Sequence, residues 1–244
     1  MSTGAKGTLH LIPVTLGDDR ACAGLPQATL ALVNALDYFI VENEKSARRF
    51  LKNAAHPTPL QQLQIERFDK NSDAARAAQL LQPLGAGRSA GVLSEAGCPA
   101  IADPGALLVA AAHRAGLRVV PHVGPSSPLL ALMASGFNGQ RFAFCGYLPV
   151  PKDQCRREIT KLERESRAHD MTQIFIETPY RNDALLQILL ETCDGKTRLC
   201  VASDLTLASE TVRSTTIAAW NKEKTEIGRR PSVFLLYARG TCRT

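Results

Sequence analysis

A loop of small residues that carries two carboxylates, Glu95 and Asp103, is the segment of this sequence best suited to chemistry. It lies within residues 93–105, LSEAGCPAIADPG, and follows a short apolar strand at residues 90–93. Asp103-Pro104 is typical of a helix start, because Asp is a good N-cap and Pro is favoured at the first helical position. A loop between a strand and a helix is the usual ligand site of an α/β sheet. The two carboxylates favour a hydroxylated or cationic ligand over a bare phosphate.

The composition is that of a globular protein. The chain has 244 residues, of which 45% are hydrophobic and 21% are charged, and this length suffices for one large domain or two of moderate size. No apolar run approaches the roughly 18 residues that span a bilayer. The N-terminal segment MSTGAKG lacks the apolar region of a signal peptide. We therefore expect a cytoplasmic protein without a membrane segment.

The cysteines and histidines show no metal-binding pattern. The seven cysteines are scattered, several of them in or near apolar segments, and no pair has CxxC spacing. The five histidines have no ligand spacing either. We expect buried free thiols and no bound metal.

Basic residues give the chain a net charge of +6 and gather in two segments. One contains Arg48, Arg49 and Lys52, and the other is residues 152–168. In the second segment acidic and basic residues alternate and hydrophobic residues are sparse, which favours a solvated helix with i,i+4 pairs such as Glu163 with Arg167. A surface that faces nucleic acid stays open as the alternative. The charge favours a polyanionic partner only weakly, so RNA binding is permitted.

Strands and helices alternate along the first half of the chain. Strands are expected at residues 8–14, 38–41, 90–93 and 117–120, and helices at residues 27–36, 44–54 and 103–114. Residues 71–73 are expected to cap a further helix that runs to about residue 82. Alternation of this kind predicts a largely parallel sheet.

The second half continues with strands and helices after a linker. A helix at residues 128–135 is expected to end at Gly136, a typical C′ glycine. Strands are expected at residues 142–147, 173–176, 198–203, 211–216 and 233–238. Neither face of residues 211–216 is strongly apolar, which indicates an exposed antiparallel strand near an edge. The linker PHVGPSS predicts two α/β domains, residues 1–121 and 122–244, with a cleft between them.

Several ordered motifs carry a family resemblance. LSEAGCPAIADPG resembles VSDAGTPxISDPG, and residues 118–136, RVVPHVGPSSPLLALMASG, resemble VVPLPGPSAxxALxASG. RFAFCGYLP, IFIETPYR and CVASDLT, which begin at residues 141, 174 and 200, resemble RFxFEGFLP, VFYESPHR and VVARELT. These are motifs of the tetrapyrrole-methylase-like, or class III, S-adenosylmethionine-dependent methyltransferases. The resemblance covers about residues 9–238 and is nearest the branch that includes ribosomal RNA small-subunit methyltransferase I, which methylates a ribose 2′-hydroxyl.

The chain departs from the family pattern at several positions. Residues 12–18, IPVTLGD, stand where porphyrin methylases have GxGPGD, which counts against a tetrapyrrole substrate. Residues 40–46, IVENEKS, stand where the ribosomal branch has AAEDTR; Glu42 matches the Glu of that motif, while Asn43 and Glu44 replace the Asp and Thr that follow. Glu95 and Cys98 replace Asp and Thr in the DAGTP loop, and Cys145 replaces a Glu. The chain therefore resembles a divergent member of the family.

The resemblance implies an architecture, a cofactor and an assembly. The fold would be two α/β/α domains with a cofactor cleft between them, the cofactor S-adenosylmethionine, and the assembly a homodimer. The residues that would bind the cofactor are Ser94, Glu95, Ala96, Gly97, Cys98, Pro99, Val123, Gly124, Pro125, Ser126, Ser127, Leu148, Pro149, Glu177, Pro231 and Ser232. Gly97 and Gly124 would allow a close backbone approach or a positive φ.

Glu42 and Glu95 are the candidate catalytic residues. A ribose hydroxyl is a poor nucleophile at neutral pH, so a general base would help, and each glutamate follows a strand expected to be buried. A capping or surface carboxylate is the alternative for either one. Asp103 is expected to be a structural cap, and Arg181 to contact either an anionic acceptor or a backbone carbonyl.

Three functions are compatible with the sequence. The leading one is methyl transfer to RNA, to a ribose 2′-oxygen of small-subunit ribosomal RNA. The second is methyl transfer to a small molecule such as a tetrapyrrole. The third is a cofactor-binding protein without transfer activity, which the altered IVENEKS segment keeps open.

Overall fold

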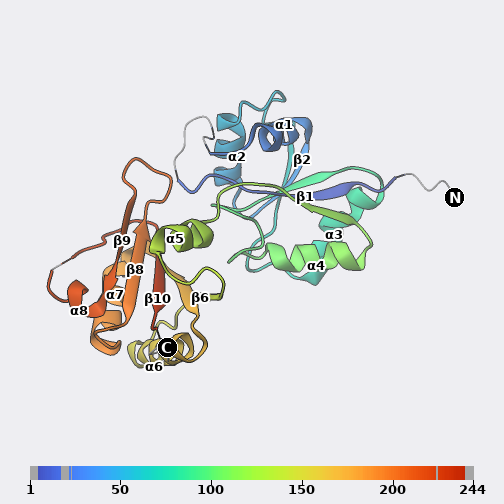
Figure 1. Cartoon of the computed structure of the whole chain (residues 1–244). Helices are drawn as coiled ribbons and strands as arrows, with labels where there is room; N and C mark the ends of the chain where they lie inside the picture. Colours follow the sequence, from blue (N-terminus) through green and yellow to red (C-terminus); the bar gives the residue numbers. More distant parts are fainter. Residues whose placement is uncertain (1–4, 18–21, 23, 224, 240–244) are drawn as a thin grey trace. The chain divides into compact units, whose positions relative to one another are not determined.

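The chain divides into two compact units, which are described separately. The computed structural model describes residues 5–17, 22, 24–223 and 225–239 (Figure 1). Unit 1 is Met1–Ser126 and unit 2 is Ser127–Thr244. The boundary falls at the end of the segment PHVGPSS.

Unit 1 is built on a five-stranded sheet with the strand order β3-β2-β4-β1-β5. Its strands are β1 (Thr8–Ile12), β2 (Tyr38–Val41), β3 (Gln64–Arg67), β4 (Ala90–Leu93) and β5 (Arg118–Pro121). All neighbouring strands are parallel, which confirms the expected parallel sheet. Every residue of β2 and β4 is buried, as in parallel sheets covered on both faces.

In the described residues of unit 1, four α-helices cover this sheet on its two faces. They are α1 (Gln27–Ala35), α2 (Glu44–Asn53), α3 (Ala74–Gly85) and α4 (Gly105–Arg114). Figure 1 shows α1 and α2 on one face and α3 and α4 on the other. Successive strand residues point to opposite faces, so Phe39 packs in the cluster under α1 and α2 while Ile40 packs in the cluster under α3 and α4. Asp73 caps α3 as expected, because its carboxylate accepts the backbone N–H of Arg76 at 2.8 Å.

The edge strand β3 is not predicted by the sequence pattern. Its four residues contain one apolar side chain, Ile65, and none of the four is buried. The segment becomes a strand because it pairs in register with β2 from Tyr38↔Gln64 to Val41↔Arg67. The open edge of β2 therefore decides its conformation.

Unit 2 contains a second five-stranded sheet, with the order β6-β7-β10-β8-β9. Its strands are β6 (Phe142–Tyr147), β7 (Thr172–Glu177), β8 (Arg198–Ser203), β9 (Thr211–Thr216) and β10 (Ser232–Tyr237). Only β6 and β7 are parallel, and the other neighbours are antiparallel. β9 is an antiparallel edge strand with no buried residue, as its sequence predicts.

The helices of unit 2 are α5 (Ser127–Ser135), α6 (Lys152–His169), α7 (Asn182–Thr192) and α8 (Ile217–Trp220), and a short 3-10 helix, η2, spans Pro179–Arg181. Gly136 follows α5 with φ +69°, which confirms the expected C′ glycine. α6 and α7 pack against one core with Phe175 and Phe234. The expected pair on α6 is present, with Glu163 Oε1 and Arg167 Nη2 3.7 Å apart.

Membrane, disulfide and metal features were sought in the described ranges. No helix there has the length and apolarity needed to span a bilayer. The six cysteines described are free, and Cys22, Cys155 and Cys200 are buried; Cys242 lies outside the described residues. The same ranges contain no group of three or more side chains arranged to hold a metal ion.

A substitution in β4 tests the packing of the unit 1 sheet. We expect Gly91→Ala to lower the free energy of unfolding by about 1–3 kcal/mol, because the added Cβ would lie 2.9 Å from both Ile12 Cδ1 and Phe39 Cδ1. Gly85→Ala is the matched control, since nothing lies within 4 Å of its Cβ position and Ala is favoured in helices. Urea unfolding of the full chain measures both. Equal stability of the two variants would contradict the packing described here.

Candidate functional site

The carboxyl ends of β1, β2 and β4 meet at one edge of the unit 1 sheet. Beyond β1, Val14 forms a bridge with Gly97, with N···O distances of 2.9 and 3.2 Å. Beyond β2, the backbone N–H of Glu42 donates to Leu93 O at 3.3 Å. These contacts place the loop after β4 between the ends of its two neighbours in the sheet. Ligands of open α/β sheets bind at this edge.

The two glutamates predicted to be catalytic lie together at this edge. The Glu42 carboxylate accepts a hydrogen bond from the backbone N–H of Glu95. Burial raises the pKa of Glu42 above its ordinary value of 4.5, and the negative charges of Glu95 and Asp103 raise it further. Glu95 itself is exposed, and its Oε1 accepts the hydroxyl of Ser46 at 3.4 Å. One carboxyl is thus held partly desolvated beside a second, exposed one.

A cavity of about 230 Å³ opens next to Glu95. Three segments line it: the loop after β1, one face of α2, and the start of the loop after β4. The lining residues are Val14, Thr15, Leu16, Gly17, Ser46, Arg49, Phe50, Asn53, Ser94 and Glu95. The segment IPVTLGD therefore reaches the cavity through residues 14–17, while Asp18 lies outside the described residues.

Asp103 shapes the loop after β4 by binding backbone amides. Its Oδ1 accepts the N–H of Ala100 and the N–H of Gly105, each at 2.7 Å. The helix α4 therefore begins at Gly105, two residues later than the expected start at Asp103, because the carboxylate closes the preceding turn. Ala100 and Ala102 have φ of +67° and +60°. Such strain in residues other than glycine persists only where the surroundings hold it.

Within unit 1, the residues expected to bind the cofactor come together in two adjoining segments, 94–99 and 123–126. The thiol of Cys98 donates to Pro125 O at 3.4 Å, and burial raises the pKa of this thiol, which keeps it protonated. Gly97 has a φ of +70°. A Cβ on Gly124 would lie 2.3 Å from Pro13 Cβ, so this glycine permits a close approach to Pro13 of the same unit.

In unit 2, Glu177 and Ser232 lie on neighbouring strands, and Leu148 follows the strand on the other side of β7. Ser232 is the register partner of Glu177 across β10 and β7, and of Ser203 across β10 and β8. The hydroxyls of Ser232 and Ser203 are 2.7 Å apart. Leu148 directly follows β6 and is buried. Pro149 and Pro231 adjoin these positions in the chain, and Ser127 begins α5.

Two further residues of unit 2 complete this group. Arg181 Nη2 lies 3.0 Å from Glu177 Oε2, so Arg181 binds a carboxylate rather than the backbone carbonyl considered from the sequence. Asn182, which sequence analysis did not single out, donates to Gly228 O at 3.1 Å and to Arg230 O at 2.7 Å. Its buried Oδ1 receives no hydrogen bond from the part of the chain that is described.

Ser46, Arg49 and Asn53 are cavity residues that the sequence analysis did not assign to the site. Arg49 was noted only as a member of a basic segment. The signal for these residues is their helical spacing after Glu42, which places them on the face of α2 that lines the cavity.

Comparisons with known proteins identify the family. The family profile of tetrapyrrole (corrin/porphyrin) methylases matches residues 9–220. The chain belongs to this family. It is accordingly a methyltransferase, with the α/β architecture of two sheets expected from the resemblance.

Individual relatives carry a more specific name than the family profile does. A protein of Xylella fastidiosa (strain Temecula1) named ribosomal RNA small subunit methyltransferase I is 32% identical, over 98% of this chain and 83% of the relative. A protein of the same name from Escherichia coli O157:H7 is 29% identical, over 97% of this chain and 79% of the relative. The crystal structure of the methyltransferase CobJ matches with a TM-score of 0.63 at 19% identity, covering 99% of this chain and 97% of that one. At this identity the structural likeness shows the fold alone.

The coupling of the two glutamates is directly testable. We expect Glu95→Gln to lower the pKa of Glu42 toward its ordinary value, because one of the negative charges that raise it is removed. Carbon-detected NMR titration of the glutamate carboxyls measures this shift. Glu44→Gln is the control, because Glu44 is not among the groups that shift Glu42. An unchanged Glu42 pKa in Glu95→Gln would show that the two groups are uncoupled.

The raised pKa of Glu42 also makes the free energy of unfolding depend on pH. Because the folded pKa of Glu42 is raised, its stabilising contribution is fully present below the unfolded pKa and is lost as the pH rises through the folded value. Glu95→Gln should therefore weaken this pH dependence, and Glu44→Gln should leave it unchanged. Unfolding free energies measured across the acidic range would show the difference.

Two substitutions distinguish the role of Asp103 as a hydrogen-bond acceptor from the role of its charge. Asp103→Ala removes the acceptor of two backbone N–H groups and should lower the free energy of unfolding by about 1–2 kcal/mol. Asp103→Asn keeps an oxygen at this position and should cost much less. Thermal unfolding of the full chain compares them. A large and equal loss in both variants would mean that the charge, rather than the acceptor, is required.

Proposed function

We propose that this chain transfers a methyl group from S-adenosylmethionine to a ribose 2′-hydroxyl of small-subunit ribosomal RNA. The observation that carries the proposal is the pair Glu42 and Glu95 at adjoining strand ends, with the pKa of Glu42 raised by burial and by its acidic neighbours. The relatives named ribosomal RNA small subunit methyltransferase I support the choice of acceptor.

The residues present fit the proposed cofactor. S-adenosylmethionine carries an amino group, ribose hydroxyls and an adenine amine, all of which donate hydrogen bonds. The buried Oδ1 of Asn182 is an acceptor with no donor among the described residues. The residues proposed to hold the cofactor are Ser94, Glu95, Ala96, Gly97, Cys98, Pro99, Val123, Gly124, Pro125 and Ser126 of unit 1, and Ser127, Leu148, Pro149, Glu177, Pro231 and Ser232 of unit 2.

When bound, S-adenosylmethionine supplies a methyl group already activated by its sulfonium, so the chain's task is alignment and proton removal. Glu42 takes the proton of the acceptor hydroxyl. Its raised pKa brings this carboxylate nearer to neutral pH than an ordinary glutamate, which strengthens it as a base. Glu95, held by the Ser46 hydroxyl, keeps that pKa raised and faces the cavity where the acceptor ribose binds.

The proposal includes a location in the cell and an oligomeric state. A cytoplasmic location fits this proposal, because the relatives named ribosomal RNA small subunit methyltransferase I are bacterial proteins. The family resemblance implies a homodimer, and sedimentation of the pure protein measures it directly.

A transfer assay tests the proposal. The pure protein is incubated with methyl-labelled S-adenosylmethionine and with small ribosomal subunits from cells that lack a ribosomal RNA small-subunit methyltransferase I. We expect label in the RNA, and resistance of the labelled position to alkaline cleavage, because a 2′-O-methyl group blocks attack by that oxygen. Glu42→Gln should slow transfer by about 10²–10⁴-fold, while Glu44→Gln, on the same segment but paired with Arg48, should keep it.

Two outcomes would overturn parts of this proposal. Absence of label in RNA, with cofactor binding confirmed by calorimetry, would exclude this acceptor. Transfer that persists at full rate in Glu42→Gln would exclude Glu42 as the base.

A further inference from the structure

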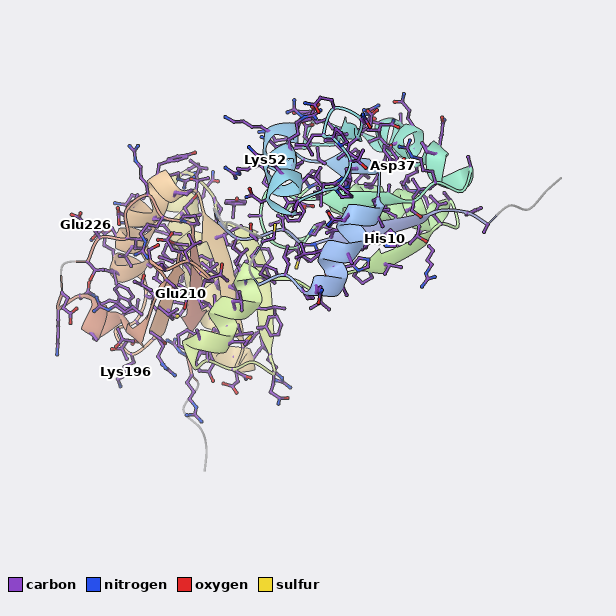
Figure 2. All side chains as sticks on the ribbon, turned by 90° about the horizontal axis from the view of Figure 1, so that it is seen from above. His10, Asp37, Lys52, Lys196, Glu210 and Glu226 are labelled. Atoms are coloured by element: carbon purple, nitrogen blue, oxygen red, sulfur yellow. The ribbon has the colours of Figure 1, made fainter. Side chains whose placement is uncertain are left out.

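Three cations form a row on α2. Lys45, Arg49 and Lys52 are spaced i, i+4 and i+7, so they lie along one face of the helix, and all three are exposed. Figure 2 labels Lys52 on this helix. At 1.5 Å per residue the row is about 10 Å long. None of the three forms an ion pair with a carboxylate of the described part of unit 1 or unit 2.

The neighbouring arginine of the same helix behaves differently. Arg48 Nη2 lies 3.7 Å from Glu44 Oε2, and its Nη1 donates to Leu60 O at 3.0 Å. The guanidinium of Arg48 is therefore occupied within unit 1. Lys45, Arg49 and Lys52, which we call the α2 cation row, repel one another and gain from an external anion.

The α2 cation row borders the cavity beside Glu95. Arg49 belongs to both, because it lines the cavity together with Ser46 and Asn53 of the same helix. The charges therefore change sign over a short distance, from the cations on α2 to the carboxylates of Glu95 and Glu42. A small anion that entered the cavity would meet the carboxylate of Glu95. A phosphodiester strand satisfies both regions, because its phosphates stay on the row while a neutral ribose enters the cavity.

We propose that the α2 cation row binds backbone phosphates of the acceptor RNA strand and thereby positions the target ribose beside Glu95. The inference rests on the proposed function and identifies the surface that holds its substrate. Phosphate contacts of this kind fix the register of the strand without reading its sequence. The second basic segment, α6, is the competing surface, and its Arg157 and Arg164 are likewise exposed.

Two triple variants with the same change of charge separate these surfaces. The test variant is Lys45→Gln, Arg49→Gln, Lys52→Gln. The control is Arg114→Gln, Arg157→Gln, Arg164→Gln, which removes three exposed cations from the last turn of α4 and from α6. Binding of each full-length variant to unmodified small-subunit RNA is measured between low and moderate salt.

If the α2 cation row binds RNA phosphates, the test variant should differ from the control in salt dependence and in KM for RNA. Loss of three phosphate contacts to single-stranded RNA should reduce the slope of log affinity against log salt by about 2, since each contact contributes roughly 0.7. In the transfer assay, the test variant should raise KM for RNA by at least tenfold with kcat changed little. The control should keep the wild-type slope and KM. Both should bind S-adenosylmethionine with unchanged affinity, which shows that the variants are folded.

Each other result has a definite meaning. Unchanged slope and KM in the test variant, or a larger loss in the control, would overturn the inference while leaving methyl transfer by the wild type intact. If the wild type binds RNA but transfers no methyl group, the proposed function fails, and a slope reduced only in the test variant would still support the α2 cation row. If the triple variant does not fold, Arg49→Gln alone should reduce the slope by about 0.7.

Discussion

Parallel pairing of β2, β4 and β1 is the constraint on which the site of unit 1 depends. The registers Ile12↔Leu93 and Val41↔Leu93 bring three strand ends to one line. Because the three strands run parallel, the residues that follow them emerge at the same edge of the sheet. The bridge between Val14 and Gly97 extends this pairing past the strands. Glu42 and Glu95 are 53 positions apart in the sequence. They become neighbours because their strands pair in the sheet.

The loop after β4, beside the candidate site, is held by hydrogen bonds to its own backbone. Asp103 accepts two backbone N–H groups, and Ala100 and Ala102 are held at positive φ. Burial raises the pKa of Asp103, while these two hydrogen bonds lower it. The carboxylate is therefore engaged in holding the turn rather than free for a ligand. Its negative charge still reaches Glu42 and helps to raise that pKa.

The two units use different pairing to present polar groups. Unit 1 lines up residues of parallel strands that lie far apart in the chain. Unit 2 joins Glu177 and Ser203 through Ser232 of an antiparallel strand between them. Its basic helix α6 is largely engaged in ion pairs, such as Arg167 with Glu163 and Lys161 with Glu158. On α2, Arg48 pairs with Glu44, whereas Lys45, Arg49 and Lys52 have no carboxylate partner among the described residues, which distinguishes this row from most of the cations of α6.

The sequence by itself determined most local features of this protein. Hydrophobic patterns and turn residues in the sequence located β2, β4, β6, β8 and β9 at the residues where they lie, because these signals act within a few positions. The ordered sequence motifs also indicated the protein family. The same reasoning missed β3 and placed the start of α4 early, and it left open whether α6 is a solvated helix or faces nucleic acid.

Only the tertiary structure decided what those segments do together. Strand order, the raised pKa of Glu42, the amide contacts of Asp103 and the cavity lined by Arg49 depend on groups distant in the chain. Desolvation and charge coupling act through space and fall off over a few ångströms. Residue types and spacing along the chain therefore indicate which groups are available, and the packing of the sheet fixes which of them meet.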